Sequence, residues 1–174
     1  LISVVTLAIH GANWIILKTN SSINGNLKNI IFKLNIVLAA LTIFSLVVWQ
    51  VVNPNSLDNF MEKPYLMIFP LIYLTGLIGL FFIKKLKKEI HGFALSTLLI
   101  LGGITSSLAS MFPVILPSVN SVNEPLTIYN TAASNYGLSV ALTWGFIGFI
   151  LLIIYFIVQK RLMGGKIDHM DYGH

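Results

Sequence analysis

The chain has 174 residues, of which 56% are hydrophobic and only 10% are charged. A soluble domain usually carries about 25% charged residues, so this chain lacks the polar surface that an ordinary soluble enzyme needs. It contains no cysteine, which excludes a disulfide scaffold, thiolate metal sites and a cysteine nucleophile. The net charge of +5 is better explained by the basic loops of a membrane protein than by binding of nucleic acid.

Five apolar segments are candidates for membrane-spanning helices, which need about 20 mostly apolar residues. None of them contains Asp, Glu, Lys or Arg. The fourth segment is long for a span, and Pro113 and Pro117 are expected to end or kink it. We therefore predict an all-α membrane protein with a single transmembrane domain over residues 1–174. The predicted spans cover residues 1–17, 34–52, 65–83, 90–116 and 136–158.

The connections between these segments are polar. Residues 18–33 are rich in Asn, Ser and Lys, and residues 118–135 form the longest predicted loop. The chain has no initiator methionine and opens inside the first apolar segment, with no charged region or cleavage site before it. This start is not typical of a signal peptide. We expect the chain to be a fragment of a longer protein, beginning within or just before a membrane helix.

Basic residues divide unevenly between the two sides of the predicted membrane domain. Ten of the eleven follow the first, third and fifth segments, and the remaining one is Lys63. Cytoplasmic loops of membrane proteins collect Lys and Arg. Leu1 is therefore expected on the periplasmic, outer side, and the tail that ends at His174 is expected in the cytoplasm. This division requires an odd number of crossings, which five spans provide.

His10 is the one residue clearly inside an apolar segment that titrates near neutral pH, and Asn13 lies three residues later on roughly the same helical face. An unpaired polar group facing lipid is costly, so we expect this face to contact another helix, a ligand or a partner subunit. Three interpretations of His10 stay open. It is a structural histidine hydrogen-bonded within a helix bundle, a contact for a quinone head group or lipid, or a haem ligand whose second axial partner comes from elsewhere.

The sequence offers no catalytic pair and no metal site. Its six carboxylates lie in loops, at a segment boundary or in the tail, where acid–base catalysis lacks a shielded site. His169 and His174 accompany Asp168 and Asp171, but a solvated charged tail is the simpler interpretation. Phosphate loops, nucleophile elbows and dinucleotide fingerprints are absent from the sequence. We expect no catalytic, cofactor-binding or metal-binding residue here, apart from a quinone or lipid contact at His10 and Asn13.

Small residues recur within three of the apolar segments. Such spacing lets helix backbones approach closely in lipid, although Gly is also common in membrane helices in general. Together the small residues favour close packing, either within the chain or against a partner. They are Gly76 and Gly79, Gly102 and Gly103, and Gly137, Ala141, Gly145 and Gly148.

Two segments carry a family resemblance. Residues 110–118 read Ser-Met-Phe-Pro-Val-Ile-Leu-Pro-Ser, and residues 126–134 read Leu-Thr-Ile-Tyr-Asn-Thr-Ala-Ala-Ser. Their order and spacing resemble the C-terminal half of subunit II of cytochrome bd quinol oxidase. Residues 10–14, residues 18–19 and residues 164–166 also resemble that family, so the resemblance covers essentially the whole chain.

The resemblance implies helices five to nine of a nine-helix subunit, arranged as a four-helix bundle plus one peripheral helix. It implies a heterodimer with a haem-bearing subunit I in the bacterial cytoplasmic membrane. That complex is an enzyme of the aerobic respiratory chain, which oxidises a quinol and reduces dioxygen to water. Haems b and d belong to subunit I, so this chain is expected to bind no haem and to scaffold its partner. A structural quinone and membrane lipid are further contacts that the resemblance implies.

Two alternatives belong to other functional classes. The first is half of a secondary transporter built from repeats, in which broken helices carry polar sites at the membrane midplane. Pro70 and Pro113 could mark such breaks, but no charged midplane residue accompanies them. The second alternative is a plain assembly protein without turnover.

Overall fold

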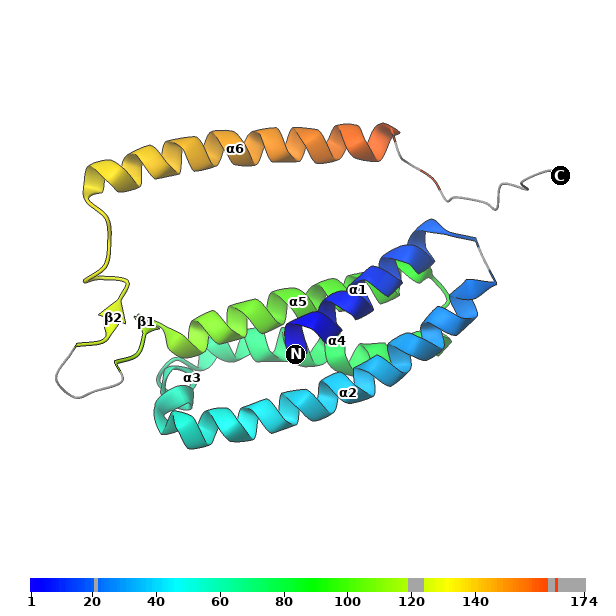
Figure 1. Ribbon diagram of the computed structural model, residues 1–174, viewed down its shortest axis with the longest axis horizontal. Helices are drawn as coiled ribbons and strands as arrows, with labels where there is room; N and C mark the ends of the chain where they lie inside the picture. Colours follow the sequence, from blue (N-terminus) through cyan, green and yellow to red (C-terminus); the bar gives the residue numbers. More distant parts are fainter. Residues whose placement is uncertain (21, 119–123, 163–164, 166–174) are drawn as a thin grey trace. The chain divides into compact units, whose positions relative to one another are not determined.

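The computed structural model describes residues 1–20, 22–118, 124–162 and 165 (Figure 1). Its described residues divide into two compact units, Leu1–Phe112 and Pro113–Gly165, and each unit is described by itself. The first unit contains α1 (Ile2–Lys18), α2 (Ile23–Val52), α3 (Asp58–Glu62), α4 (Ile68–Phe81) and α5 (Glu89–Met111). The second unit contains β1 (Val114–Leu116), β2 (Leu126–Thr127) and α6 (Asn135–Leu162).

The four longer helices of the first unit pack as a ring. α1 contacts α2 and α5, and α4 contacts α2 and α5, so each helix has two neighbours (Figure 1). The ring encloses one cluster of buried apolar side chains, to which all four helices and the turn after α4 contribute. In lipid, such a cluster is held by tight packing and interhelical hydrogen bonds rather than by burial from water. Its members are Ile9, Ile16, Ile31, Leu38, Leu77, Leu80, Ile83 and Leu99.

Glycines bring α4 and α5 into backbone contact. A Cβ atom built on Gly76 would lie 2.7 Å from the carbonyl oxygen of Leu95, and one built on Gly102 would lie 2.7 Å from Cα of Tyr73. Both distances are too short for real carbon contacts, so a side chain at either position would force the helices apart. Close packing within the chain is thus confirmed for these two glycines. The corresponding pattern on α6 stays a prediction.

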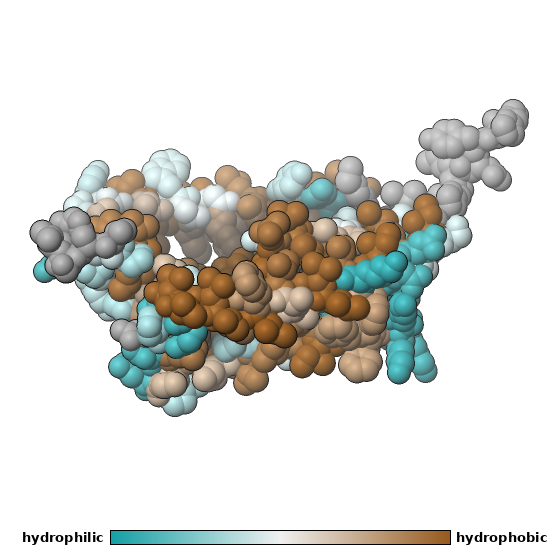
Figure 2. All heavy atoms as spheres, turned by 60° about the horizontal axis from the view of Figure 1, so that its bottom comes forward, coloured by the Kyte–Doolittle hydropathy of each residue, from teal (hydrophilic) through white to brown (hydrophobic). Residues whose placement is uncertain are grey.

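Four helical segments of the described chain are long and apolar enough to cross a membrane. They are Ile23–Val52, Pro64–Phe81, Glu89–Met111 and Asn135–Leu162, whereas Ile2–Lys18 is apolar but shorter. Figure 2 shows hydrophobic residues across the middle of the visible face and hydrophilic residues gathered towards its two ends. The all-α membrane class is therefore confirmed, and the count of five spans stays a prediction.

The boundaries of two predicted spans need correction. The helix that contains residues 34–52 begins at Ile23, so most of the loop predicted over residues 18–33 is helical. Polar residues such as Lys28 are compatible with a helix, and Leu27 and Ile31 keep the spacing of four that lets both pack against the apolar cluster. The predicted span over residues 90–116 is too long, because α5 ends at Met111.

The end of α5 follows from the proline after it. Phe112 has a ψ of 136°, an extended conformation that a residue before proline favours, so the helix stops as Pro113 predicted. The chain continues as β1, which pairs with β2 in antiparallel fashion and aligns Val114 with Thr127. The loop predicted over residues 118–135 therefore contains a strand. This pairing joins the two segments that carry the family resemblance.

Candidate functional site

His10 faces α5 inside the ring of helices. Its Nδ1 atom lies 2.9 Å from Oγ of Ser96, and its ring centroid lies 4.7 Å from that of Phe93. The Ser96 hydroxyl has one proton, which it donates to the Phe93 carbonyl oxygen at 2.9 Å. Oγ of Ser96 therefore accepts a hydrogen bond from Nδ1–H of His10. This hydrogen bond joins α1 to α5.

Asn13 lies one turn further along α1 and is only 1% exposed. Its Nδ2 group donates to the carbonyl oxygen of Ile9 at 3.0 Å. A Cβ atom at Gly92 would lie 2.5 Å from Oδ1 of Asn13, so this amide occupies the space that the missing side chain of Gly92 leaves on α5. His10 and Asn13 thus both contact α5, which is one of the three environments expected for this face.

Asn35 forms a second polar contact inside the ring, and the sequence analysis did not single it out. Its side chain is fully buried on α2, where Nδ2 donates to the carbonyl oxygen of Leu77 at 3.0 Å. Its Oδ1 atom has no hydrogen-bond partner among the described residues. The available signal was a lone amide within an apolar segment, which in lipid has to find a partner on another helix.

Two hydroxyl groups strengthen the same interface between α2 and α4. The Thr42 hydroxyl donates to the Leu38 carbonyl oxygen at 2.8 Å, and it lies 2.6 Å from the Tyr73 hydroxyl. Because the single proton of Thr42 is used within α2, the Tyr73 hydroxyl is the donor across the interface. Thr42 and Tyr73 therefore join α2 to α4 by a hydrogen bond between side chains.

Asn59 closes the end of α5. Its Nδ2 group donates to the carbonyl oxygens of Ala109 at 3.0 Å and Ser110 at 3.2 Å, and also to that of Phe112. The last carbonyl groups of a helix have no partner within the helix, so a side chain that reaches several of them stabilises the end. The short helix α3 positions Asn59 for this role.

An open groove lies beside this helix end, between the start of α4 and the end of α5. Its volume is about 410 Å³, and it is lined mainly by apolar side chains. Two of the lining residues contact each other, because Nζ of Lys63 lies 5.5 Å from the ring centroid of Phe112. His10 and Asn13 do not line it, so the structure does not bring the predicted quinone or lipid contact to this groove. The lining residues are Lys63, Tyr65, Leu66, Phe69, Thr105, Leu108, Ala109 and Phe112.

Among the described residues, no group of three or more His, Asp or Glu side chains could hold a metal ion. The tail residues that were weighed as weak metal ligands lie outside the described residues. They are Asp168, His169, Asp171 and His174.

The stretch of residues 126–130 folds into a hydrogen-bonded turn in the second unit. Oδ1 of Asn130 accepts from the backbone N–H of Thr127 at 2.7 Å, and Nδ2 of Asn130 donates to the carbonyl oxygen of Pro125 at 3.0 Å. The backbone N–H of Ile128 donates to the carbonyl oxygen of Pro113 at 3.0 Å. The residues that carry the resemblance thus hold this turn against the segment that follows α5.

Comparisons with known proteins show which family the chain resembles in sequence. The family model of cytochrome bd terminal oxidase subunit II matches residues 1–163. The chain is also 25% identical, over 192 aligned positions, to the probable cytochrome oxidase subunit 2 of Haemophilus influenzae, and the alignment covers 96% of this chain and 51% of that relative. The chain therefore spans about half the length of this curated relative. Since the family model matches most of the chain, the chain belongs to the cytochrome bd terminal oxidase subunit II family.

Proposed function

We propose that this chain is a non-haem-binding integral membrane subunit of a cytochrome bd-type quinol:dioxygen oxidoreductase. The observation that carries the proposal is the family match over residues 1–163, together with four apolar helices of membrane-spanning length. In this assembly the chain scaffolds a haem-bearing subunit I, which holds haems b and d. Quinol is the substrate of the complex, and this chain supplies packing surface rather than catalytic residues.

The use of polar side chains inside the ring supports a scaffolding role. His10 bonds to Ser96 and Asn35 bonds to Leu77, so these side chains join neighbouring helices. The contacts of His10 with Ser96 and Phe93 support a packing role for this side chain rather than haem ligation.

A structural quinone or a lipid remains part of the proposal at His10. This side chain is partly exposed, so its ring edge is the surface that such a molecule would contact. Asn13, at 1% exposure, offers no comparable surface and would act by packing against α5. The contact is therefore proposed for His10 alone.

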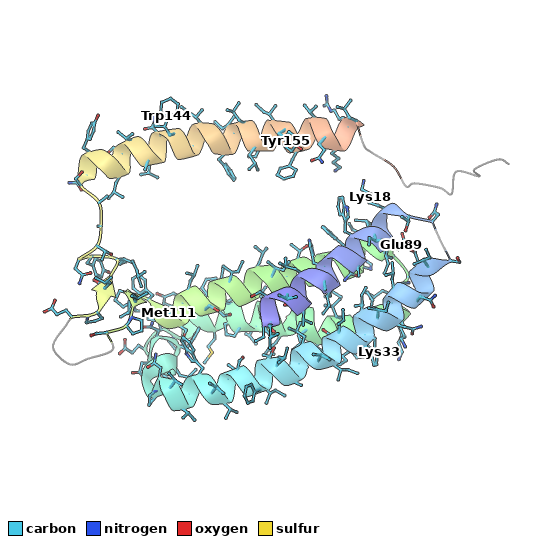
Figure 3. All side chains as sticks on the ribbon, viewed as in Figure 1. Lys18, Lys33, Glu89, Met111, Trp144 and Tyr155 are labelled. Carbon is cyan, nitrogen blue, oxygen red and sulfur yellow. The ribbon has the colours of Figure 1, made fainter. Side chains whose placement is uncertain are left out.

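The proposed topology has five crossings, with α1, α2, α4 and α5 as the four-helix bundle and α6 as the additional peripheral helix. Leu1 lies on the periplasmic side of the bacterial inner membrane and the C-terminus in the cytoplasm. The distribution of charge supports this orientation. Figure 3 places Lys18, Lys33 and Glu89 at one end of the bundle and Met111 at the other. Positive charge collects on the cytoplasmic side of membrane proteins.

The test is purification of the full-length protein from its native membrane. A haem-bearing membrane protein should co-purify in equal amounts, and the complex should oxidise quinol and consume dioxygen. The full-length protein separated from that partner should show no haem bands in a reduced-minus-oxidised spectrum. Stoichiometric haem bands in the separated subunit would contradict the proposal, and so would turnover by the partner at full rate without it.

No structural observation favours the transporter alternative. Pro70 lies in the first turn of α4 and Pro113 lies beyond the end of α5, so neither proline interrupts a described helix near its middle. Transporter sites of that kind are formed at broken helices. Substrate flux in proteoliposomes that contain the full-length protein without a haem-bearing partner would nevertheless establish transport.

A further inference from the structure

The first turn of α2 contains the one Asn-Gly dipeptide of the sequence, Asn24-Gly25. In such a dipeptide the backbone nitrogen of the glycine can attack Cγ of the asparagine, because glycine has no side chain that would crowd the attacking atom. The outcome depends on whether the attacking nitrogen is free and whether the asparagine side chain is held. The structure answers both questions at this position.

The surroundings of Gly25 favour the attack. Its backbone N–H is one of the first amide groups of a helix, which have no partner within the helix, and Ser22 makes no capping hydrogen bond through its side chain. Gly25 is exposed, and a Cβ atom built on it would have no neighbour within 4 Å. Solvent therefore reaches the nitrogen and can remove its proton. The positive end of the helix dipole stabilises the negative charge that results.

Asn24 is held by Thr19, the residue that follows α1. Nδ2 of Asn24 donates to the carbonyl oxygen of Thr19 at 2.9 Å, and Oγ1 of Thr19 lies 3.1 Å from Oδ1 of Asn24. The same hydroxyl lies 2.8 Å from the carbonyl oxygen of Ile15, so its single proton is shared between two acceptors. Both polar atoms of the Asn24 side chain thus bond to the residue after α1, and Cγ is free to approach Gly25 only after these bonds break.

We propose that Asn24 is a site of spontaneous deamidation, and that the contact with Thr19 keeps it intact. When the contact opens, the deprotonated nitrogen of Gly25 forms a bond to Cγ of Asn24. The bond from Cγ to Nδ2 breaks, and the amide group takes up a proton from water and leaves as ammonia. Water then opens the succinimide ring and leaves aspartate or isoaspartate. The product adds a negative charge to the first turn of α2, and isoaspartate also lengthens the backbone there.

The test compares the folded protein with its own denatured chain. The full-length protein, in the complex that it forms in neutral detergent, is incubated at mildly alkaline pH beside a sample denatured in urea. Mass spectrometry of peptides measures the rate at which the amide of Asn24 is replaced by a carboxyl group. The rate should be at least about tenfold lower in the folded complex, because two hydrogen bonds have to break before the attack. Equal rates in the two samples would overturn the proposal, and this comparison needs no variant.

Two threonine variants separate the contact with Thr19 from a general effect of folding. Thr19→Val removes the hydroxyl group at nearly constant size, so the rate at Asn24 in the folded complex should rise about threefold. Thr97→Val is the matched control and should leave the rate unchanged, because the Thr97 hydroxyl bonds to the Phe93 carbonyl oxygen of its own helix. Equal rates in the two variants would overturn the protective role of Thr19.

A third variant checks the chemistry of the attack. The methyl group of Gly25→Ala would meet nothing within 4 Å in the folded protein, but it crowds the attacking nitrogen. The substitution should therefore slow the reaction at Asn24 in both the folded and the denatured samples. An unchanged rate in the denatured sample would contradict attack by the nitrogen of residue 25.

Discussion

Two polar side chains, those of His10 and Asn59, each join two elements of the first unit. The apolar cluster alone would not fix the register of these elements. His10 reaches Ser96 across the α1–α5 interface, and Asn59 reaches three carbonyl groups at the end of α5. Apolar contacts are not directional, whereas a hydrogen bond fixes which residues lie opposite each other. In lipid this matters more, because burial from water does not drive helices together. The polar residues therefore specify the register of the ring.

The contact between His10 and Ser96 can be measured with a double-mutant cycle of His10→Ala and Ser96→Ala. The coupling energy should be about 0.6 kcal/mol and at most about 1.7 kcal/mol, the range for hydrogen bonds between membrane helices. The measurement is thermal or denaturant unfolding in detergent. The control cycle pairs His10→Ala with Ser107→Ala, because Ser107 bonds to the carbonyl oxygen of Gly103 on its own helix. Coupling of the same size in both cycles would contradict the contact.

Asn59→Asp should destabilise the end of α5. The substitution keeps the size of the side chain but removes its donors, so the helix-end carbonyl groups lose their partner, at a cost of about 1–3 kcal/mol. Hydrogen exchange of the last turn of α5 should rise together with a fall in the unfolding midpoint. Asn26→Asp, on the exposed surface of α2, is the matched control and should leave both values unchanged. Unaltered exchange in the Asn59 variant would disprove the cap.

At the scale of elements, α4 and α5 are the most closely associated helices of the ring. Gly76 and Gly102 face each other's helix without side chains, so backbone lies against backbone over two turns. Small residues at such positions gain dispersion contacts along the whole interface. The loss of stability on replacing a glycine of α5 should therefore depend on the face of the helix that it occupies, so neighbouring glycines should differ.

Gly102→Ala and Gly103→Ala form a matched pair. The methyl group at residue 102 would overlap the backbone of Tyr73, whereas at residue 103 it would meet ring carbons of Tyr73 at 3.4 Å and 3.5 Å. Gly102→Ala should lower stability by about 1–3 kcal/mol through overpacking. Gly103→Ala should be nearly neutral, since the helical preference of alanine over glycine, about 1 kcal/mol, offsets a tight contact. Equal unfolding midpoints for the two variants would contradict the close approach.

The apolar segments of the sequence predicted the helices well, and their ends less well. Hydrocarbon leaves a spanning chain no other way to satisfy its backbone, so a long apolar run is a strong signal for a helix. Pro113 also marked where α5 stops. The early start of α2 at Ile23 carried no such signal, because lysine and asparagine are compatible both with a loop and with a helix. Composition does not decide between them.

The strand β1 and the contacts of the candidate site were beyond sequence reasoning for a different reason. Val114–Leu116 is a strand because Leu126–Thr127 pairs with it, and this partner is distant in the chain. Likewise His10 and Asn13 were recognised as unusual, but their neighbour on α5 was one of several that the pattern allowed. Asn35 was overlooked although a lone amide in an apolar segment signals a partner on another helix, and the sequence alone does not identify Leu77 as that partner. Local sequence patterns allow several partners for each of these residues, and only the tertiary structure determines which partner is used.

At the scale of the whole molecule, the chain is a multi-pass membrane protein of the cytochrome bd terminal oxidase subunit II family. Its basic residues and its helix ring point to one proposed orientation. The charge of the loops thus predicts on which side of the membrane each turn meets solvent. It is open to a direct chemical test, because the chain contains no cysteine.

Single cysteines placed at exposed positions should report the orientation. Lys87→Cys, in the turn between α4 and α5, should react with an impermeant maleimide only when the cytoplasmic face is accessible, as in inverted vesicles. Asp58→Cys, at the opposite end of the ring, should react only in intact spheroplasts. The unsubstituted protein shows the background labelling. Labelling of both cysteines from one face would be incompatible with the proposed topology.

The lysines at one end of the helix ring, among them Lys18 and Lys33, set how deep the bundle lies in a bilayer. A shift of one helical turn along the membrane normal, about 5.4 Å, would draw ammonium groups such as those of Lys33 and Lys84 towards hydrocarbon. Each lysine at the bilayer centre costs about 2.5–3.5 kcal/mol, so even partial immersion of several opposes vertical drift. Any helix packed against such a bundle, from this chain or from a neighbouring one, would thereby be held at a constant height between the two aqueous phases.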